Sequence, residues 1–310
     1  MALTISQAQA ASYPAVLATK RKAVNQWGDA SFLNELDAQG GVEAVDFGPT
    51  LEVPIDYRRN QGGTFLSNEL QQLAATKTEV ISAASYSPAE LAVPIIWSNR
   101  DEVTNPTDNQ KINLVASLNA NAIDSHDDLI EQALFATSTN GFLGLLTHIP
   151  DNGQSSDGGI DSTTEAFWRS VNATYVDDTD ILAALTSAYN SASKGSGSSS
   201  KPTLLVSDGA TQAIFEGTQQ PLQRWDSGSE ANVGFKRLKF KNANYVYSQY
   251  GGTRIYGMNP KAFKLRVAKG YFRKMDPARS LESQPGNGAR VYSAVQTVVE
   301  ARSRLFVVKL

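Results

Sequence analysis

The chain has 310 residues, of which 41% are apolar and 19% charged, with a formal net charge of −3 and no cysteine. This composition is that of an ordinary globular protein that can bury a core without disulfides. It excludes thiolate nucleophiles and zinc–thiolate sites, and it gives no electrostatic reason to expect a nucleic-acid-binding surface. The first 22 residues lack the pattern of a secretion signal, and no run approaches the roughly 20 apolar residues of a membrane span, so we expect no membrane contact.

Residues 1–47 show no apolar periodicity that would support a core of their own. Within them, Ser31–Leu36 combines a capping serine with Glu35, which favours a short helix. We expect residues 1–47 to form an N-terminal arm.

A strand pattern begins at Thr50, where apolar side chains take alternate positions: Leu51, Val53, Ile55 and Tyr57. Pro54 cannot donate a hydrogen bond, which favours an edge strand or an exposed ribbon. A second β-rich run extends from Val80 to Trp97. The two runs predict a long two-stranded ribbon with a wide loop at its end. An isolated ribbon is marginally stable, so this one should need a partner surface.

The clearest helix signal covers Thr107–Thr137. Thr107 and Gln110 have capping-box spacing, and the following apolar stripe consists of Val115, Leu118, Ala122, Leu129 and Ala133, with Ile123, Ile130 and Leu134 beside it. Acidic residues occupy the other face. At about 1.5 Å per residue this helix is roughly 45 Å long, which predicts a spine for its part of the molecule.

The remaining sequence predicts an α+β fold. Residues 146–252 alternate helix and strand, with helices at 180–193 and 210–216 and strands at 204–206 and in the run Ala243–Tyr250. From Thr253 onward the sequence is mostly strand.

The turn after the strand at 204–206 raises the question of catalysis at Ser207. Its context, L-V-S-D-G, lacks the first glycine of a nucleophile elbow, and no histidine follows His148, so Ser–His catalysis starting at Ser207 is excluded. Gly209 alone does not make a phosphate loop. We predict that Ser207 or Asp208, with Ser207 preferred, caps the short helix, and that Gly217 ends it.

Other candidate chemistry is weak. The two histidines, His126 and His148, lack the further ligands that a metal site needs, so we expect no catalytic residue, no metal and no cofactor. Asp177, Asp178 and Asp180 precede a helix, where we expect them to cap it and complement its dipole. An enzyme that uses these three carboxylates with a divalent metal remains an alternative.

Several stretches resemble the HK97-like major capsid proteins of tailed bacteriophages: residues 158–170, 202–225, 234–247 and 275–280. The resemblance covers roughly Gly41 to the C-terminus, and its most specific parts are the motifs GGID…FWR and LKFKNA. It implies an HK97-like capsid fold with an N-terminal arm (1–47), an extended β-hairpin E-loop (48–98), a peripheral domain with the spine helix (99–145), an α/β axial domain (146–252) and a return to the peripheral β-sheet (253–310).

The resemblance also implies a function. Such proteins assemble through pentamers and hexamers into an icosahedral shell that encloses the phage genome. The expected partners are copies of the chain itself, portal and scaffolding proteins, and double-stranded DNA contacted non-specifically. The expected location is the virion, assembled in the host bacterial cytoplasm. An encapsulin-like nanocompartment, which shares the fold and lacks a genome, is the alternative.

Shell contacts of this kind join different patches on neighbouring subunits. Arg58 and Arg59, where the first strand enters the loop, are candidates for such a contact, with partners on the acidic helix face at Asp124, Asp127 and Asp128 of a neighbour. A solvated arginine pair is the alternative.

Overall fold

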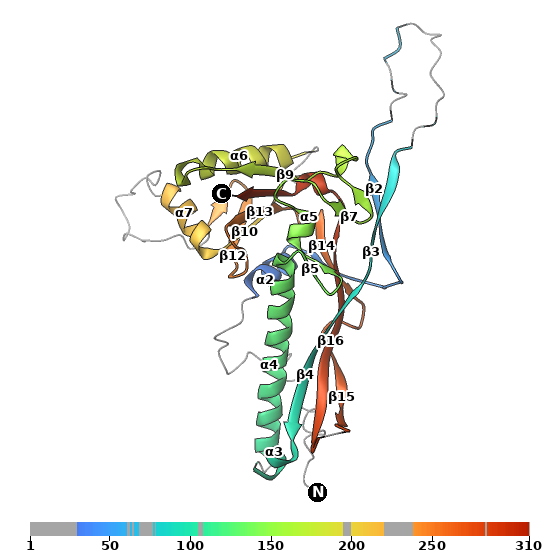
Figure 1. Ribbon diagram of the computed structural model, residues 1–310, viewed down its shortest axis with the longest axis vertical. Coiled ribbons are helices and arrows are strands. Elements are labelled where there is room, and N and C mark those ends of the chain that lie inside the picture. Colours follow the sequence, from blue (N-terminus) through green and yellow to red (C-terminus); the bar gives the residue numbers. More distant parts are fainter. Residues whose placement is uncertain are drawn as a thin grey trace.

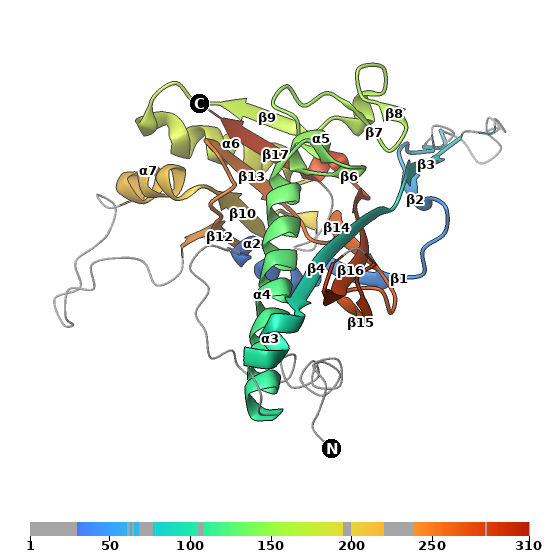
Figure 2. The same cartoon turned by 60° about the horizontal axis from the view of Figure 1, so that its bottom comes forward.

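The computed structural model describes residues 30–60, 63, 65–67, 77, 79–104, 108–194, 200–219, 238–282 and 284–309. Most of the predicted N-terminal arm, most of the ribbon's loop and the capping residue Thr107 therefore lie outside the described residues. In the described part, a long helix stands between two sheets, and a two-stranded ribbon projects from one of them (Figures 1 and 2).

The elongated part of the molecule is a five-stranded sheet built around β16 (Gly286–Val299). Along one edge, β16 pairs with β14 (Phe263–Ala268) and then with β15 (Lys274–Ser280); β14 in turn pairs in parallel with β1 (Val42–Val45). Along the other edge, β16 pairs with β4 (Ala89–Ser98) through ten consecutive antiparallel residue pairs.

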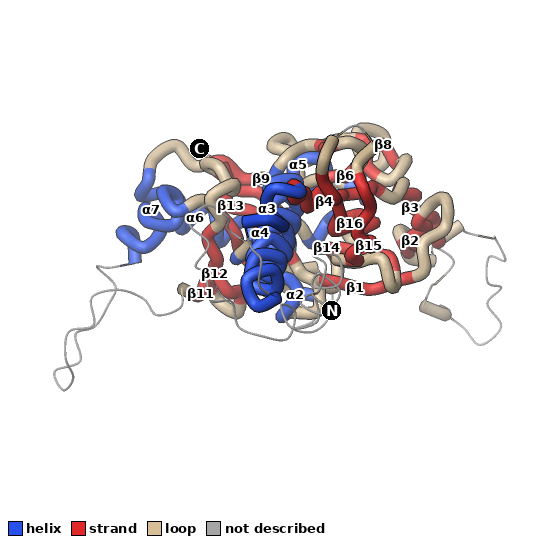
Figure 3. The backbone as a smooth tube through the Cα atoms, turned by 90° about the horizontal axis from the view of Figure 1, so that it is seen from below, coloured by secondary structure: helices blue, strands red, loops and turns tan. Residues whose placement is uncertain are grey.

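Helix α4 (Asp108–Phe135) lies along this sheet, and the short α3 (Asn99–Thr104) connects it to β4 (Figure 1). Viewed from below, α4 has β4, β16 and β15 on one side and the second sheet on the other (Figure 3). The side chains that join α4 to its sheet form one buried cluster: Val93, Ile95, Trp97, Val115, Ala122, Ala289 and Val291. Each large apolar side chain buried in this way stabilises the fold by roughly 1.5–3 kcal/mol.

The predicted stripe of α4 needs one correction. Leu129 is 40% exposed, whereas Ile130 and Leu134 are buried. The buried face of α4 includes two polar residues, Asn119 and His126. Because apolar spacing alone passes over them, it predicts a buried stripe that is displaced by one residue from the observed one.

The second sheet has six strands, in the order β11 (Lys239–Phe240), β12 (Ala243–Tyr247), β10 (Leu204–Ser207), β13 (Arg254–Met258), β17 (Phe306–Lys309) and β9 (Val171–Thr174). Helices α6 (Ile181–Ala192) and α7 (Gly209–Gln219) pack against this sheet (Figure 1). The short 3₁₀ helices η2 (Asp178–Asp180) and η5 (Arg302–Arg304) precede α6 and β17, respectively.

The second sheet corrects the expected return of residues 253–310 to the peripheral sheet. Only β14, β15 and β16 lie in the five-stranded sheet, while β13 and β17 occupy the centre of the six-stranded one. Both strands are almost continuously buried, and strands of that kind need cover on both faces. The centre of the second sheet, with α6 on one face and the main core on the other, provides it.

The alternation from Leu51 onward is confirmed: β2 (Leu51–Asp56) buries every second residue and pairs with β3 (Ile81–Tyr86). The run Val80–Trp97 is two strands, however, because β4 leaves the ribbon and joins β16. At the base of the ribbon, Leu51, Val53, Ile55, Ala84 and Tyr86 are all buried in the main cluster. The partner surface expected for the ribbon is therefore, at its base, the body of the same subunit.

The hairpin of β7 (Ser156–Asp157) and β8 (Ile160–Asp161) approaches the ribbon base closely. Gly158 in its turn has φ +60°, and its carbonyl oxygen accepts the Ser85 N–H at 2.9 Å. A Cβ at Gly158 would lie 2.6 Å from Ala84 Cβ, so only glycine allows this approach.

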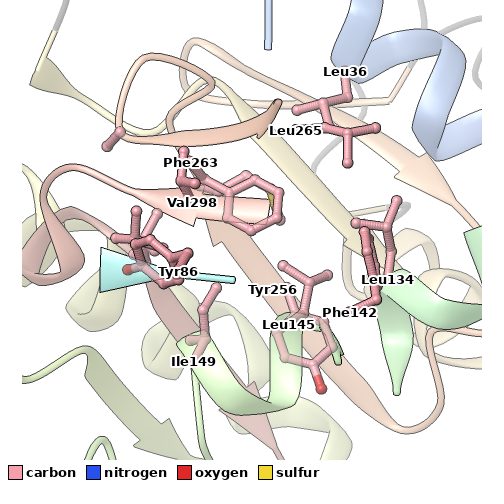
Figure 4. Packing of buried hydrophobic residues seen from close by; sticks show 14 of the residues in the cluster. Leu36, Tyr86, Leu134, Phe142, Leu145, Ile149, Tyr256, Phe263, Leu265 and Val298 are labelled. Carbon is pink, nitrogen blue, oxygen red and sulfur yellow. The ribbon is translucent and has the colours of Figure 1, made fainter. Parts of the chain in front are cut away.

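The main core lies where the ribbon base, α2 (Ser31–Ala38), the end of α4 and both sheets meet. Figure 4 shows side chains from these elements packed around Phe263 and Val298. After α4, the chain forms a hairpin of β5 (Ser138–Thr139) and β6 (Phe142–Leu143) and then α5 (Leu145–His148); η1 (Ala166–Trp168) contributes the buried Trp168.

The strand–turn–helix at Leu204–Gln219 is confirmed, but its cap is Asp208. Asp208 Oδ1 accepts the Thr211 N–H at 2.8 Å, while the Ser207 hydroxyl bonds to the Tyr245 hydroxyl and the Asp208 carbonyl oxygen. Ser207 is the last residue of a fully buried strand, so its side chain faces the sheet interior. Gly217 lies within α7, which continues to Gln219.

We predict that Gly158→Ala destabilises the protein more than Gly159→Ala. Both glycines have positive φ, which costs alanine about 1–2 kcal/mol, but a Cβ at Gly159 meets nothing within 4 Å. The clash with Ala84 adds about 1–3 kcal/mol at Gly158. Urea unfolding of both variants measures the difference, and equal losses would show that the hairpin does not press on the ribbon.

Candidate assembly surface

Arg58 and Arg59 are exposed where the ribbon leaves the body of the molecule. The Tyr57 ring packs on Phe167, with centroids 4.7 Å apart, and the Arg58 guanidinium lies 5.4 Å from the Tyr57 centroid. These aromatic contacts fix the direction in which the chain leaves the ribbon base.

Arg58 also lines a hollow of about 300 Å³ that contains two carboxylates of its own subunit, Asp161 and Glu165. Hydrogen bonds from the Thr163 hydroxyl and N–H lower the pKa of Asp161, so this carboxylate is ionised at neutral pH. These acids are distant in sequence, which is why the residues next to Arg58 and Arg59 did not reveal them.

The acidic face of α4 makes contacts within the subunit. Asp127 Oδ1 accepts the Arg273 Nε–H at 2.9 Å, forms an ion pair with Arg273 Nη2 at 2.9 Å, and lies 3.2 Å from His126 Nδ1. Asp128 accepts the Tyr250 hydroxyl at 2.9 Å, and Asp124 is half-buried on the same helix. The structure thus brings Asp127 and Asp128 to partners other than Arg58 and Arg59; their contact with a neighbouring subunit stays a prediction.

Glu131 is a functional residue that sequence reasoning missed. It is fully buried, and its carboxylate accepts the Phe32 and Leu33 N–H groups, at 3.3 and 3.1 Å, and the Ser248 hydroxyl at 2.6 Å. It therefore caps α2 from another helix, since the N-cap residue Ala30 makes no capping bond. The partners lie about a hundred positions away, so no local signal could have identified this role.

The residues considered for catalysis differ in their exposure to solvent. His126 and His148 are fully buried, and Asp177, Asp178 and Asp180 are exposed. The three aspartates make no capping hydrogen bond, so the prediction that they cap the helix is wrong, although their charge still lies at its N-terminal end. Among the described residues, no group of three or more His, Asp or Glu side chains could hold a metal ion.

An open apolar groove of about 320 Å³ lies between α4, β4 and the β5–β6 hairpin. Leu91, Leu129, Ala133 and Phe142 line it, and Glu90 is at its edge. In the described part of the chain, no helix combines the length and the apolar character needed to cross a membrane.

No protein-family model matches the chain, and no curated protein matches it. Solved structures do. The capsid of cyanophage A-1(L) superposes with a TM-score of 0.64 at 14% identity, covering 94% of this chain and 96% of that one. The capsid of a native GTA particle gives 0.61 at 12% identity, covering 94% of each chain. The holo-SrpI encapsulin of Synechococcus elongatus PCC 7942 gives 0.56 at 12% identity, covering 100% of this chain and 96% of that one.

These likenesses identify the fold. The chain has the HK97-like capsid fold, and both phage capsids and an encapsulin are among the structures that share it.

We predict that Asp127→Asn lowers the free energy of unfolding of the subunit by about 1 kcal/mol. The amide keeps the shape of the carboxylate but loses the charge that holds Arg273, and partial exposure of Arg273 keeps the loss small. Asp178→Asn, at an exposed acid without a capping bond, is the control and should change stability by less than about 0.5 kcal/mol. A variant of Asp127 with unchanged stability but defective assembly would instead place this carboxylate in a contact between subunits.

Proposed function

We propose that this chain is a major capsid protein that assembles through pentamers and hexamers into an icosahedral shell around a phage genome. The observation that supports it most is the match to a phage capsid chain over nearly the full length of both proteins. The match covers 94% of this chain and 96% of the capsid chain. Portal and scaffolding proteins and the packaged double-stranded DNA would be its further partners, and the virion its location.

The domains of the proposal follow the two sheets. We assign the five-stranded sheet and α4 to the peripheral domain, the six-stranded sheet with α6 and α7 to the axial domain, and the ribbon of β2 and β3 to the E-loop. The arm would be residues 1–47, although β1 within this range pairs with β14 of the five-stranded sheet. In this assignment β4 belongs to the peripheral domain through its pairing with β16, although it lies within residues 48–98.

The edges of the strands favour contacts through side chains. The open-edged strands β2, β4 and β15 each carry an exposed proline in mid-strand, at Pro54, Pro94 and Pro277. A proline offers no N–H to a further strand and blocks sheet extension. Neighbouring copies would therefore meet through faces and hollows, such as the groove between α4 and β4.

The proposal predicts that the purified full-length chain forms rings or closed particles at moderate concentration. Light scattering and negative-stain microscopy of the overexpressed protein test this. A species that stays strictly monomeric across salt and protein concentration, with its scaffold supplied, would overturn the proposal.

An encapsulin-like shell is the second candidate, supported by the encapsulin match over the whole chain. The two candidates differ in what the shell encloses. Terminase and portal genes beside the coding gene would support the capsid, and a cargo gene in their place would support the nanocompartment.

We further predict that Arg58→Glu combined with Arg59→Glu prevents closed particles while leaving the circular dichroism and melting of the subunit nearly unchanged. Each exposed ion pair contributes only about 0–1 kcal/mol, but a shell repeats it in every subunit. Arg58→Lys with Arg59→Lys is the control, because it keeps both charges and should assemble.

Particles at normal yield from the double glutamate variant would exclude these arginines from the contact. A destabilised subunit would show that Arg58 acts within its own hollow, on Asp161 and Glu165.

A further inference from the structure

His148, the last residue of α5, is a fully buried bridge between a carboxylate and strand β16. Its Nδ1 lies 2.8 Å from Asp157 Oδ2, and its Nε2 lies 2.8 Å from Thr297 Oγ1. The Thr297 hydroxyl donates its single proton to the carbonyl oxygen of Leu143, which can only accept. His148 Nε2 must therefore donate to Thr297, and Nδ1 must donate to the carboxylate. A ring that donates from both nitrogens is an imidazolium.

His126, the other histidine of the chain, also bridges a carboxylate and a hydroxyl of β16, but its contacts need fewer protons on the ring. Its Nε2 lies 2.7 Å from Ser293 Oγ, four positions before Thr297 on the same face of β16, and its Nδ1 faces Asp127. Ser293 Oγ accepts the Arg273 N–H at 2.7 Å, and its own proton can be donated to His126 Nε2. One ring proton, on Nδ1, is then enough for both contacts. The contacts of His126 therefore do not require a second ring proton.

The groups around His148 favour the charged pair. Arg302 Nε lies 3.9 Å from Asp157 Oδ2, and a cation at this distance keeps the carboxylate ionised, which disfavours a neutral ring facing a protonated Asp157. Burial raises the pKa of Tyr86, and the charge of Asp157 raises it further, so this phenol is neutral. Phe263 packs edge-on against the ring.

Two cations thus face one buried carboxylate, whose second oxygen, Oδ1, has no hydrogen-bond partner among the described residues. Burial lowers the pKa of Arg302, and Asp157 opposes this fall; the guanidinium also donates to the backbone oxygens of Thr147, His148 and Ser155. With five donors and no acceptor, Arg302 is fixed in place.

The residue after Asp157 is Gly158, whose carbonyl accepts the Ser85 N–H of the ribbon and whose Cα packs on Ala84 and Tyr86. We propose that the His148–Asp157 ion pair is a lock that fixes the β7–β8 hairpin, and with it the ribbon base, to the body of the subunit. The lock is a property of the single subunit and stands whether or not the chain forms shells.

Nitrogen NMR of the full-length chain with ¹⁵N-labelled histidine tests the two protonation states at neutral pH. We expect both ring nitrogens of His148 in the protonated range, and one protonated and one unprotonated nitrogen, well separated, for His126. His126→Gln leaves a single histidine and assigns the signals. A neutral ring at His148 would overturn the proposal.

Thr297→Val tests the lock itself, with Thr297→Ser as the matched control that keeps the hydroxyl. In the valine variant His148 should become neutral, and the hydrogen-exchange protection of the Ser85 amide should fall by about tenfold relative to Val206 in the second sheet, as expected for loss of one charge-assisted hydrogen bond. The serine variant should match the wild type.

If the valine variant does not fold, Asp157→Asn replaces it, because the amide keeps the shape of the carboxylate and loses its charge. The protection of Ser85 relative to Val206 should again decrease. Unchanged relative protection, in either variant, would show that the ion pair does not hold the ribbon base.

Discussion

The pairing of β4 with β16 is the constraint on which the rest of the structure depends. Ten consecutive residue pairs, from Gly286 opposite Ser98 to Val295 opposite Ala89, fix the strand register, and a shift of one residue would turn every side chain to the wrong face. The correct register places Trp97 and Val93 toward α4 and Ser293 and Thr297 toward the two histidines. Strand β4 also follows the ribbon strand β3 in the chain, so the pairing with β16 positions the base of the ribbon. The sheet, the helix α4 and the ribbon are therefore all positioned by β4.

Local pattern in the sequence is enough to locate most elements. Alternation gives β2, and apolar spacing gives α4 and the strand–turn–helix around Ser207, because each pattern lies within one element. Partner choice among strands is different. The pairing of β4 with β16 and the central position of β13 and β17 join segments up to about two hundred residues apart, so no window of sequence contains them. The resemblance to a capsid family supplied the overall architecture, but it placed β13 and β17 in the wrong sheet.

The candidate site shows a second limit of prediction from sequence: polar residues are expected to be exposed, and some of them are buried. In α4 the buried positions Asn119 and His126 interrupt the apolar stripe, and Glu131 is buried because it caps α2. His126 and Glu131 are buried with hydrogen-bond partners, which come from β16 and α2 respectively. The acidic face predicted from the sequence is therefore partly an internal network. One signal was present: positions 115, 119, 122, 126, 130 and 134 recur at helical spacing if polar residues are allowed.

The same strand that organises the subunit also limits how subunits could meet. Because β4 has β16 on one edge and Pro94 in its own sequence, its other edge cannot add a strand from a neighbour, and Pro54 does the same for β2. Interfaces made of side chains are weaker per contact than added strands and can be adjusted individually. A ribbon whose base is fixed by Gly158 and the His148–Asp157 pair has a defined direction before any neighbour binds it. The cost of ordering the ribbon base is then met within the subunit, so weak contacts farther along the ribbon need only overcome the remaining loss of freedom.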